Sequence, residues 1–551
     1  MHSLAYCLFL IIATSFADIL SIGLIIPYIN LLISPNNFYE RFISFTLVDS
    51  LSLENFIIFV SIFYASILIA STILRVYSLS IHSKILFTMG NKLSVALYHQ
   101  ILKMPYSFFQ TRNSSELISI ILIKAEAIIT GILTPLISTL SALFLGLMIL
   151  IFLSQINLTV TVCVIVFFVF YFALVGMRIK SKVIKNALII STESTSGIKK
   201  IQEGVGGIRD ILLDKSQAIF VSDFANSDME LKKAKANNIF MSQFPKLVIE
   251  GVTLASIVIL TSFVLISGNS LSSWVSLLAI LAISAQKILP LAQQSFYGWS
   301  KIESTWPLLL EILDLFEESA KLDPTVDFEL KNQLPFMNII ELTGVCFKYD
   351  LSNNYVLNDF SLKIQKGDRI AIVGESGSGK STLLDILMGL SRPSSGKITV
   401  DGVDLVEDQY LYLWREKVAH VPQSVFIIDG TVVENVAFGV PKCNVDYARV
   451  ASSLISAGLP EYANFAIEKS DFKLGERGIK LSGGQRQRIG IARALYSNAE
   501  VLFFDEATNS LDKYNEAKIF ESIKALSPNI TIIVVAHNTD ILKEDFKIYR
   551  V

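Results

Sequence analysis

The stretch GESGSGKST, from Gly374 to Thr382, lies between an apolar run, RIAIVG (369–374), and a helical run, STLLDILMGL (381–390). It fits the pattern G-x-x-x-x-G-K-[ST], in which glycines let backbone N–H groups converge on phosphate oxygens. The start of the following helix adds partial positive charge. We therefore predict a strand, a phosphate-binding loop and a helix here. The residues expected to bind the nucleotide in this loop are Gly374, Glu375, Ser376, Gly377, Ser378, Gly379, Lys380, Ser381 and Thr382.

A second motif, VLFFDEA (501–507), places two carboxylates at the end of an apolar strand. Asp505 is placed to hold Mg²⁺ directly or through water, together with the hydroxyl of Ser381. Glu506, one residue further on, can polarise the attacking water as a general base. The alternative is an Asp-Glu pair that starts a helix, because helix N-termini favour acidic side chains.

The chain as a whole is more apolar than a typical globular protein. Hydrophobic residues make up 52% of its 551 residues and charged residues 17%, whereas globular domains average about 25% charged. The net charge of −2 does not indicate a basic surface of the kind that binds nucleic acid, so no nucleic-acid partner is expected. The four cysteines lie far apart in the sequence and form no CxxC pair, which indicates neither a zinc site nor a disulfide framework.

The first three hundred residues contain six apolar stretches that are long enough to cross a membrane. A bilayer core of about 30 Å requires about 20 apolar residues in one helix. We expect spans at about residues 4–33, 56–79, 128–153, 158–177, 247–267 and 271–291. A buried core helix is the usual alternative for one such run, but six together favour a multi-pass membrane domain. No basic segment precedes the first run, so it is expected to be a span and not a cleavable signal peptide.

The basic residues predict the orientation of these spans. Five lie between the second and third spans and twelve between the fourth and fifth, whereas the opposite loops contain only Arg41. Because cytoplasmic loops carry the excess of Lys and Arg, both long segments and both termini should face the cytoplasm. Periodicity alone leaves two interpretations of these segments open. They are either solvated amphipathic loops or helices that run on from the spans and turn through a short crosswise helix, near 104–117 and 206–220.

A change of composition divides the chain into a predicted transmembrane domain (1–310), a linker (311–336) and a nucleotide-binding domain (337–551). The linker is charged and contains two prolines. Beyond it, short apolar runs alternate with helical ones. The runs RIAIVG, KITVDG (397–402), VLFFDE (501–506) and TIIVVAH (531–537) are typical of strands that are buried on both faces of a mainly parallel sheet.

A third motif, LSGGQRQRIGIARAL (481–495), resembles the signature of the ATP-binding-cassette (ABC) ATPases. The whole chain resembles a half-size exporter of that superfamily, and most of all the bacterial flippases for lipid-linked oligosaccharides. The ATPase part matches every expected motif in order, and the membrane half matches in layout and in phrases such as GLIIPYI (23–29). The resemblance implies an α-helical transmembrane domain of six spans, with long cytoplasmic helical extensions, fused to an α/β P-loop nucleotide-binding domain.

The resemblance also implies individual roles for residues outside the loop. Tyr349 would stack on adenine, although a packed edge tyrosine is the alternative. Gln423 would touch Mg²⁺ and the attacking water, which makes it catalytic together with Glu506 and His537. Asp512 would lie across a dimer interface. The signature residues, which would face the γ-phosphate of the ATP in the other subunit, are Ser482, Gly483, Gly484 and Gln485. The expected metal ligands are Ser381, Gln423 and Asp505.

Because such a signature completes a site in another subunit, the resemblance implies a homodimer with twelve spans and two shared ATP sites. ATP and Mg²⁺ are the expected cofactors of an ATP hydrolase coupled to transport. The protein would lie in the cytoplasmic membrane of a bacterium, with the nucleotide-binding domain in the cytoplasm. One departure from the family is that the first span begins almost at Met1, where the family has a short amphipathic helix.

Three interpretations of the function remain open. The first is a flippase for a lipid-linked glycan, supported by a first outer loop (34–55) that can hold a short amphipathic helix and weakened by the scarcity of arginines in the membrane half. The second is an exporter of peptides, drugs or other lipids. The third, a soluble ATPase or a non-transporting regulator, is disfavoured by the apolar half. Asp18 and Arg75 fall within or at the ends of spans. They mark a transport pathway, or they form an interhelical pair, or the arginine snorkels to the cytoplasmic surface.

Overall fold

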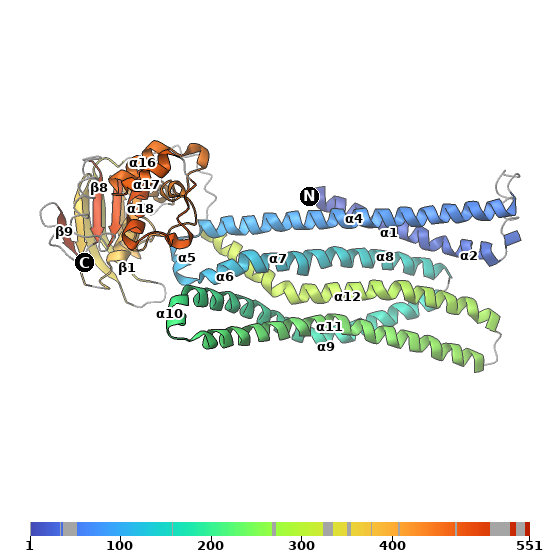
Figure 1. Cartoon of the computed structure of the whole chain (residues 1–551). Coiled ribbons are helices and arrows are strands. Elements are labelled where there is room, and N and C mark those ends of the chain that lie inside the picture. Colours follow the sequence, from blue (N-terminus) through green and yellow to red (C-terminus); the bar gives the residue numbers. More distant parts are fainter. Residues whose placement is uncertain are drawn as a thin grey trace. The chain divides into compact units, whose positions relative to one another are not determined.

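The structure of the protein is a computed structural model, and it divides the chain into two compact units (Figure 1). One unit contains residues 1–104 with 111–323, and the other contains residues 105–110 with 324–551. The residues that the structure describes are 2–33, 35–36, 52–156, 158–266, 271–322, 334, 336–349, 354–375, 377–405, 408–468, 471–506, 529–535 and 546–551. Several predicted features, namely the first outer loop, Ser376, Asp512 and His537, lie wholly or mostly outside these residues.

Long helices build the first unit. They are α1 (His2–Gly23), α2 (Ile25–Ile33), α4 (Leu53–Lys103), α8 (Thr134–Ile156), α9 (Leu158–Gly206), α11 (Gln217–Ile266) and α12 (Leu271–Leu322). The described residues of the predicted apolar stretches are helical: 4–33 runs over α1 and α2, and 128–153 begins before α8 and continues in it. Four of the long helices, α4, α9, α11 and α12, contain 51, 49, 50 and 52 residues. At 1.5 Å per residue each is about 75 Å long, more than twice the hydrocarbon thickness of about 30 Å. The long basic segments are therefore helical extensions and not loops.

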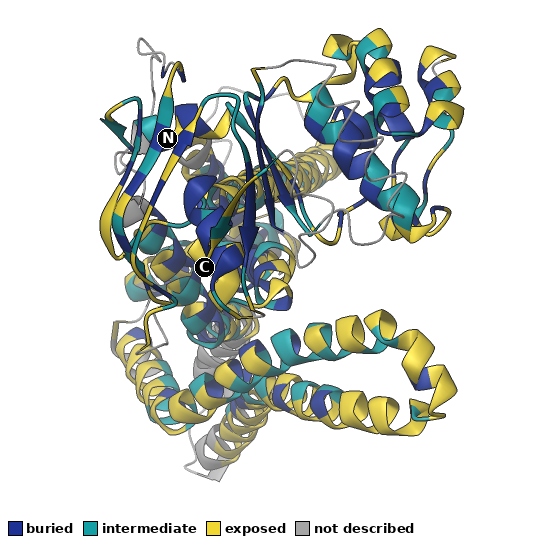
Figure 2. Cartoon of the chain, turned by 90° about the vertical axis from the view of Figure 1, so that its left-hand side faces the viewer, coloured by how far each residue is buried: buried dark blue, intermediate teal, exposed yellow. Residues whose placement is uncertain are grey.

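Much of the surface of these helices is exposed (Figure 2), and many of their large apolar side chains are among the exposed ones. By length and composition, two helical stretches in the described part of the chain, Leu53–Lys103 and Ser114–Gln155, could each cross a membrane. The number of six spans stays a prediction. The last helix, α12, continues to Leu322 and so covers the first part of the segment that the sequence predicts as a linker.

Short helices lie at the two places where the sequence predicts reversals. These are α5 (Tyr106–Thr111) followed by α6 (Ser114–Ile118), and α10 (Ile208–Leu213), which lies between α9 and α11 (Figure 1). Between α6 and α8 the helix is irregular. Two π-helical segments, η1 (Ser119–Lys124) and η2 (Ile129–Leu133), flank the four-residue helix α7 (Ala125–Ile128).

Close approach of α12 to α8 requires glycine. A Cβ atom on Gly298 of α12 would lie 1.9 Å from Oγ1 of Thr139 and 3.1 Å from the backbone oxygen of Pro135, both on α8. Side-chain Cβ atoms essentially never approach so closely, so no other residue fits here without displacing α8. Elsewhere in the unit, α11 packs along α9 and α1 packs along α4.

Asp18 and Arg75 form an interhelical pair between α1 and α4. Oδ1 of Asp18 accepts hydrogen bonds from Nε of Arg75 at 2.6 Å and from Oγ of Ser71 at 2.8 Å. The carboxylate is buried, and its charge is therefore compensated within the protein. Of the interpretations of these charges, the structure supports the interhelical pair.

In the described residues beyond 336, the second unit contains two sheets and six α-helices. The five-stranded sheet has the order β6-β7-β8-β3-β9 and is parallel throughout, and the four-stranded sheet has the order β2-β1-β4-β5 and is antiparallel. The strands are β1 (Ile339–Phe347), β2 (Leu357–Gln365), β3 (Arg369–Val373), β4 (Ser395–Val400), β5 (Val403–Asp404), β6 (Val418–Val421), β7 (Val501–Asp505), β8 (Thr531–Val535) and β9 (Lys547–Arg550). The helices are α13 (Lys380–Leu387), α14 (Asp408–Arg415), α15 (Val432–Val436), α16 (Tyr447–Ser456), α17 (Pro460–Ile467) and α18 (Gly483–Tyr496).

Both faces of the parallel sheet are covered. On β7, Val501 and Phe503 belong to one hydrophobic cluster, and Leu502 and Phe504 belong to another. A strand that is buried on both faces reads as a continuous apolar run, so the prediction is confirmed for β3, β7 and β8. It was wrong for KITVDG, which lies in β4 of the antiparallel sheet. There Ile398 and Val400 are buried while Lys397 is exposed, the alternation of a strand with one covered face.

Candidate nucleotide site

The predicted phosphate loop connects β3 to α13 in the second unit. Gly377 and Gly379 have φ angles of 84° and 96°, in the left-handed region where glycine is favoured. At Gly374 a Cβ atom would lie 2.6 Å from Oγ of Ser378 and 2.6 Å from the backbone oxygen of Val551. This tight curve therefore favours glycine at Gly374 and Gly379, which the motif specifies, and also at Gly377, which it leaves open.

Polar groups of the loop fit a phosphate. Nζ of Lys380 donates hydrogen bonds to the backbone oxygens of Gly374 at 2.9 Å and Glu375 at 2.7 Å, which holds the buried ammonium against the loop. The buried Oγ of Ser378 has no hydrogen-bond partner in the described part of the chain. A buried hydroxyl without a partner costs about 1–3 kcal/mol, and a phosphate oxygen would satisfy it. The start of α13 contributes backbone N–H groups that no intrahelical bond uses.

The carboxylates of the second motif lie beside this loop. A hydrogen bond from Ser381 reaches the carboxylate of Asp505, the last residue of β7. Burial raises the pKa of the Asp505 carboxyl and the charge of Glu506 raises it further, while Lys380 and Ser381 act against this rise. A carboxylate and a hydroxyl are hard oxygen ligands of the type that Mg²⁺ prefers.

Glu506 and Gln423 are brought together directly. Nε2 of Gln423 donates to a carboxylate oxygen of Glu506 at 3.0 Å. The φ angle of Glu506 is 50°, a left-handed conformation that a residue with a side chain rarely adopts. Its backbone N–H donates to Val535 at 3.2 Å, which connects this strained turn to β8. A strained backbone at a carboxylate beside a phosphate loop is typical of a functional site.

Tyr349, the residue proposed to stack on adenine, is hydrogen-bonded to the loop. Its hydroxyl lies 2.9 Å from Oγ1 of Thr382, and its ring contacts Phe347 edge-on at a centroid distance of 5.1 Å. The ring is exposed, as a stacking platform must be. Its role in binding adenine stays a prediction.

Two polar residues near the site were missed by the sequence analysis. Asp385, on α13, has a pKa raised to about 6, chiefly by burial and also by the charge of Asp505. Its signal was a lone acid inside the apolar run STLLDIL. Gln487, on α18, is buried and donates from Nε2 to the backbone oxygen of Gln423 at 3.3 Å. It supports the segment that carries Gln423, and its signal was a polar residue on the buried face of the signature helix.

The signature turn begins α18 with a reciprocal cap. Oγ of Ser482 accepts from the backbone N–H of Gln485 at 3.2 Å, and Oε1 of Gln485 accepts from the backbone N–H of Ser482 at 2.9 Å. Space within 4 Å of a Cβ on Gly483 is open. In the described residues, the side-chain hydrogen bonds of Ser482 and Gln485 therefore run to each other and not to the phosphate loop. The helix N-terminus retains its partial positive charge for an anion from outside.

Two family models match the chain. The model described as "ABC transporter transmembrane region" matches residues 4–289, and the model described as "ABC transporter" matches residues 357–509. The chain therefore belongs to the ABC transporter family. It is a half-transporter of the exporter type, with one helical transmembrane domain and one domain that binds ATP, and it couples ATP hydrolysis to transport.

Curated relatives and a solved structure agree with this family. The ATP-dependent lipid A-core flippase of Saccharophagus degradans is 30% identical over 451 residues, which are 80% of this chain and 73% of the relative. ABC transporter B family member 29, chloroplastic, of Arabidopsis thaliana is 29% identical over 374 residues, 67% of this chain and 57% of that protein. A bacterial Atm1-family ABC exporter with ATP bound has a TM-score of 0.79 at 17% identity, over 100% of this chain and 93% of that one, which establishes a shared fold.

Proposed function

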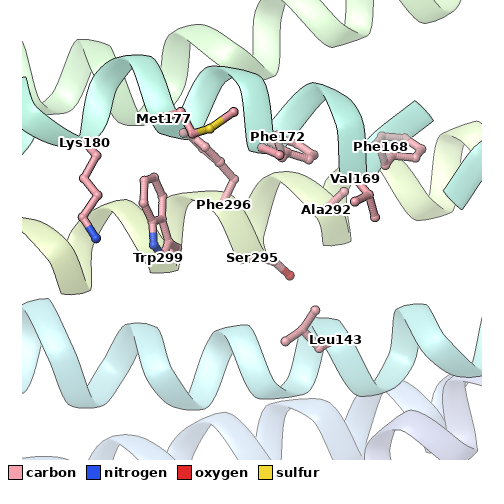
Figure 3. Close-up of a pocket in the computed structure, with 12 residues that line it drawn as sticks. Leu143, Phe168, Val169, Phe172, Met177, Lys180, Ala292, Ser295, Phe296 and Trp299 are labelled. Atoms are coloured by element: carbon pink, nitrogen blue, oxygen red, sulfur yellow. The ribbon is translucent and has the colours of Figure 1, made fainter. Parts of the chain in front are cut away.

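We propose that this exporter flips a lipid-linked oligosaccharide, or a related lipid-linked glycan, across the cytoplasmic membrane of a bacterium. It would act as a homodimer whose nucleotide-binding domains lie in the cytoplasm. The observation that carries the proposal of a lipid-like substrate is an apolar cavity within the helical unit (Figure 3). Its volume is about 500 Å³, within the range of about 300–1,000 Å³ that ligand pockets occupy.

Aromatic side chains of α9 and α12 form much of the wall of this cavity. The rings of Phe172 and Phe296 stack at a centroid distance of 5.1 Å. The ring of Phe168 lies 6.2 Å from that of Phe172, and the ring of Trp299 lies 5.5 Å from that of Phe296. Leu143 lines the side formed by α8 (Figure 3). A hydrocarbon chain fits such a wall, because burial of apolar surface is favourable and a polar moiety would lose hydrogen bonds to water there.

A polar pair lies at the end of the cavity. Lys180 lines it and extends from α9 beside Trp299 (Figure 3), and its Nζ lies 2.8 Å from a carboxylate oxygen of Glu303 on α12. An amphipathic substrate would place its apolar chain against the aromatic wall and its polar head beside this pair. Glu303 neutralises the charge of Lys180, so this end of the cavity attracts a strongly anionic head group less. This favours the second candidate function, export of other lipids or drugs.

The residues of the nucleotide site account for the ATP-driven step. Ser381, Gln423 and Asp505 would hold Mg²⁺, which supplies positive charge to the phosphates when it is bound. Glu506 accepts the proton of the attacking water, and the hydrogen bond from Gln423 fixes its carboxylate for that task. Lys380 and the N–H groups of the loop hold the phosphate charge. The signature turn would complete the site in the second copy, so that ATP pulls the two nucleotide-binding domains together.

Transport into or out of one leaflet tests the proposal. The full chain is placed in proteoliposomes with a fluorescent lipid-linked oligosaccharide, and the loss of fluorescence from one leaflet is followed with and without ATP. We expect ATP-dependent loss with the unmodified chain and none with Glu506→Gln. If the glycolipid does not move while a small cationic dye is exported, the flippase proposal is wrong and the second candidate is favoured.

A further inference from the structure

Three glutamates of α12 each form an ion pair with a basic residue from another part of the helical unit. Glu303 pairs with Lys180 of α9 at 2.8 Å, and Glu318 pairs with Arg112, which directly follows α5, at 2.9 Å. Between them, Glu311 pairs with Lys124 of η1. At 3.6 residues per turn the three glutamates fall within about a quarter of the helix circumference. One side of α12 is therefore joined by charge to several segments of the same unit.

The middle pair contains the most deeply buried of the three basic side chains, whereas the side chain of its glutamate, Glu311, is 37% exposed. The side chain of Lys124 is 7% exposed, against 53% for Lys180 and 31% for Arg112. The second carboxylate oxygen of Glu311 accepts a hydrogen bond from Oγ of Ser191 on α9 at 2.8 Å. One carboxylate thus connects α12, η1 and α9. A buried ammonium requires a partner of this kind, because water does not solvate it.

The helix that carries Lys124 is irregular at this point. Lys124 ends the π-helical segment η1, and a second π-helical segment, η2, follows α7. In η2, a Cβ on Gly131 would lie 2.1 Å from Oγ1 of Thr305 on α12, so α12 also packs closely against the second segment. Short π segments inside α-helices occur frequently at functional sites, and they are places where a helix can kink.

These contacts restrict how α12 can move. A shift of α12 along η1 would leave the Lys124 ammonium buried without its carboxylate, which is strongly unfavourable. The chain reaches the ATP-binding unit by two routes, through α12 beyond Leu322 and through residues 105–110, which belong to that unit and precede Arg112. The ion pair of Arg112 with Glu318 is close in sequence to both routes, because Arg112 follows residues 105–110 and Glu318 lies one turn before Leu322.

We propose that Lys124 and Glu311 are positioning residues that make α12 and the π-helical stretch move as one body when ATP closes the dimer. The inference rests on the proposed ATP-driven homodimer, but not on the identity of its substrate. Neither residue belongs to the candidate nucleotide site or lines the cavity of Figure 3. It would transmit movement and leave the chemistry of hydrolysis in place.

The test uses the full chain in lipid nanodiscs, with the four native cysteines replaced by alanine and a spin label on Leu158→Cys, at the exposed start of α9. Three paired variants are compared with this parent. Lys124→Met with Glu311→Leu replaces the pair by apolar residues, and Lys124→Glu with Glu311→Lys exchanges the charges. The matched control, Lys199→Met with Glu203→Leu, removes an exposed pair within α9 whose side chains are 54% and 57% exposed.

Three quantities are measured: the thermal unfolding midpoint, the rate of Mg-ATP hydrolysis, and the change in label-to-label distance that ATP with vanadate produces. For the apolar variant we expect a midpoint within about 4 °C of the parent, because apolar replacement of a buried ion pair is often neutral. We expect hydrolysis within about threefold of the parent. Most of the distance change should be lost, the exchanged pair should regain it, and the control should keep all of it.

A full distance change in the apolar variant would overturn the inference. It would also be overturned if the exchanged pair failed to regain the change, or if stability, hydrolysis and distance change fell together, because that result describes a purely structural pair. If the parent itself shows no distance change, the proposed ATP-driven dimer is wrong, and the inference with it. A parent that moves but does not flip the glycolipid leaves this inference intact and refutes only the substrate.

Discussion

Glu506 combines a strained backbone with a fixed carboxylate. A left-handed conformation costs a residue with a side chain about 1–2 kcal/mol, and here the hydrogen bonds to Gln423 and Val535 hold it. The motif located this residue because strand, acid and position are all visible in the sequence. Its strain and its bond to Gln423 were not visible, since both depend on how β7, β8 and the segment of Gln423 meet in space.

Replacement of Glu506 by Gln keeps the size of the side chain and removes the base. We expect ATP to bind with nearly unchanged affinity while hydrolysis falls at least about 100-fold, the usual contribution of a general base. Binding of a fluorescent ATP analogue and steady-state phosphate release measure the two effects. Glu416→Gln, at an exposed position, serves as the control and should leave both unchanged. Retained turnover in the Glu506 variant would remove it as the base.

Glu500 is a structural residue whose contribution should depend on pH. Its carboxylate accepts hydrogen bonds from Nζ of Lys366 at 2.7 Å and from Nζ of Lys417 at 2.6 Å, and its side chain is 27% exposed. Burial raises the pKa of this carboxyl, whereas the hydrogen bonds and the charges of the two lysines lower it. The lowering is the larger effect, so the pKa lies below its usual value of 4.5. The carboxylate therefore stabilises the fold above about pH 4.5, and this contribution is lost as the pH falls through the lower, folded-state pKa.

For Glu500→Gln we expect the free energy of unfolding to fall by about 1–3 kcal/mol at neutral pH. The difference from the unmodified chain should shrink at about pH 4 and below, where the carboxyl begins to take up a proton in both states. Thermal unfolding of the detergent-solubilised full chain across this pH range measures it. Glu461→Gln, exposed on α17, should show no such dependence. An equal loss at neutral and acidic pH would contradict the role assigned to the two lysines.

At the scale of elements, close helix packing depends on single glycines. Alanine favours a helix over glycine by about 1 kcal/mol. At Gly251 on α11, no atom of the described residues outside the local helix backbone lies within 4 Å of a new Cβ, so Gly251→Ala should be neutral or stabilising. Gly298→Ala on α12 should instead destabilise the protein by about 1–3 kcal/mol, because its Cβ would collide with α8. Comparison of the two melting midpoints tests this. A Gly298 variant that is as stable as the Gly251 variant would show that α8 and α12 can separate freely.

The elements that the sequence predicted are those whose burial leaves a pattern. Strands β3, β7 and β8 are covered on both faces and read as unbroken apolar runs, whereas the one-sided β4 was placed in the wrong sheet. The polar halves of α9 and α11 were left undecided between helix and loop, because their stability comes from packing against each other. The segments η1 and η2 leave no trace in composition, since a π-helix differs from an α-helix only in its hydrogen bonds.

At the scale of the whole molecule, the order of domains was predictable because phosphate binding allows few residue types at each position. The glycines, Lys380 and Asp505 are specified by that chemistry. The substrate was not predictable in the same way, because a cavity wall and a lipid-facing surface use the same apolar side chains. The row of Phe172, Phe296 and Trp299 became visible only when α9 and α12 were seen side by side.

Two halves of one ATP site should come from two copies of the chain. Ser482 and Gln485 bond each other within the described residues, and the space beside Gly483 is open. The proposed homodimer would place the ATP of a second copy there. Gly483→Asp would fit the helix start, where acids are favoured, but would repel that phosphate. Lys380→Ala would disable the phosphate loop of its own chain.

The most direct measurement is ATP hydrolysis by purified mixed dimers that carry both Lys380→Ala and Gly483→Asp, arranged in two ways. With the two changes in different chains, a shared site predicts clear hydrolysis, because one unaltered loop still faces one unaltered signature turn. With both changes in the same chain, each site contains one defect and hydrolysis should be lost. The reverse result, activity only when both changes lie in one chain, would show that each chain uses its own signature turn and that ATP does not join the two copies.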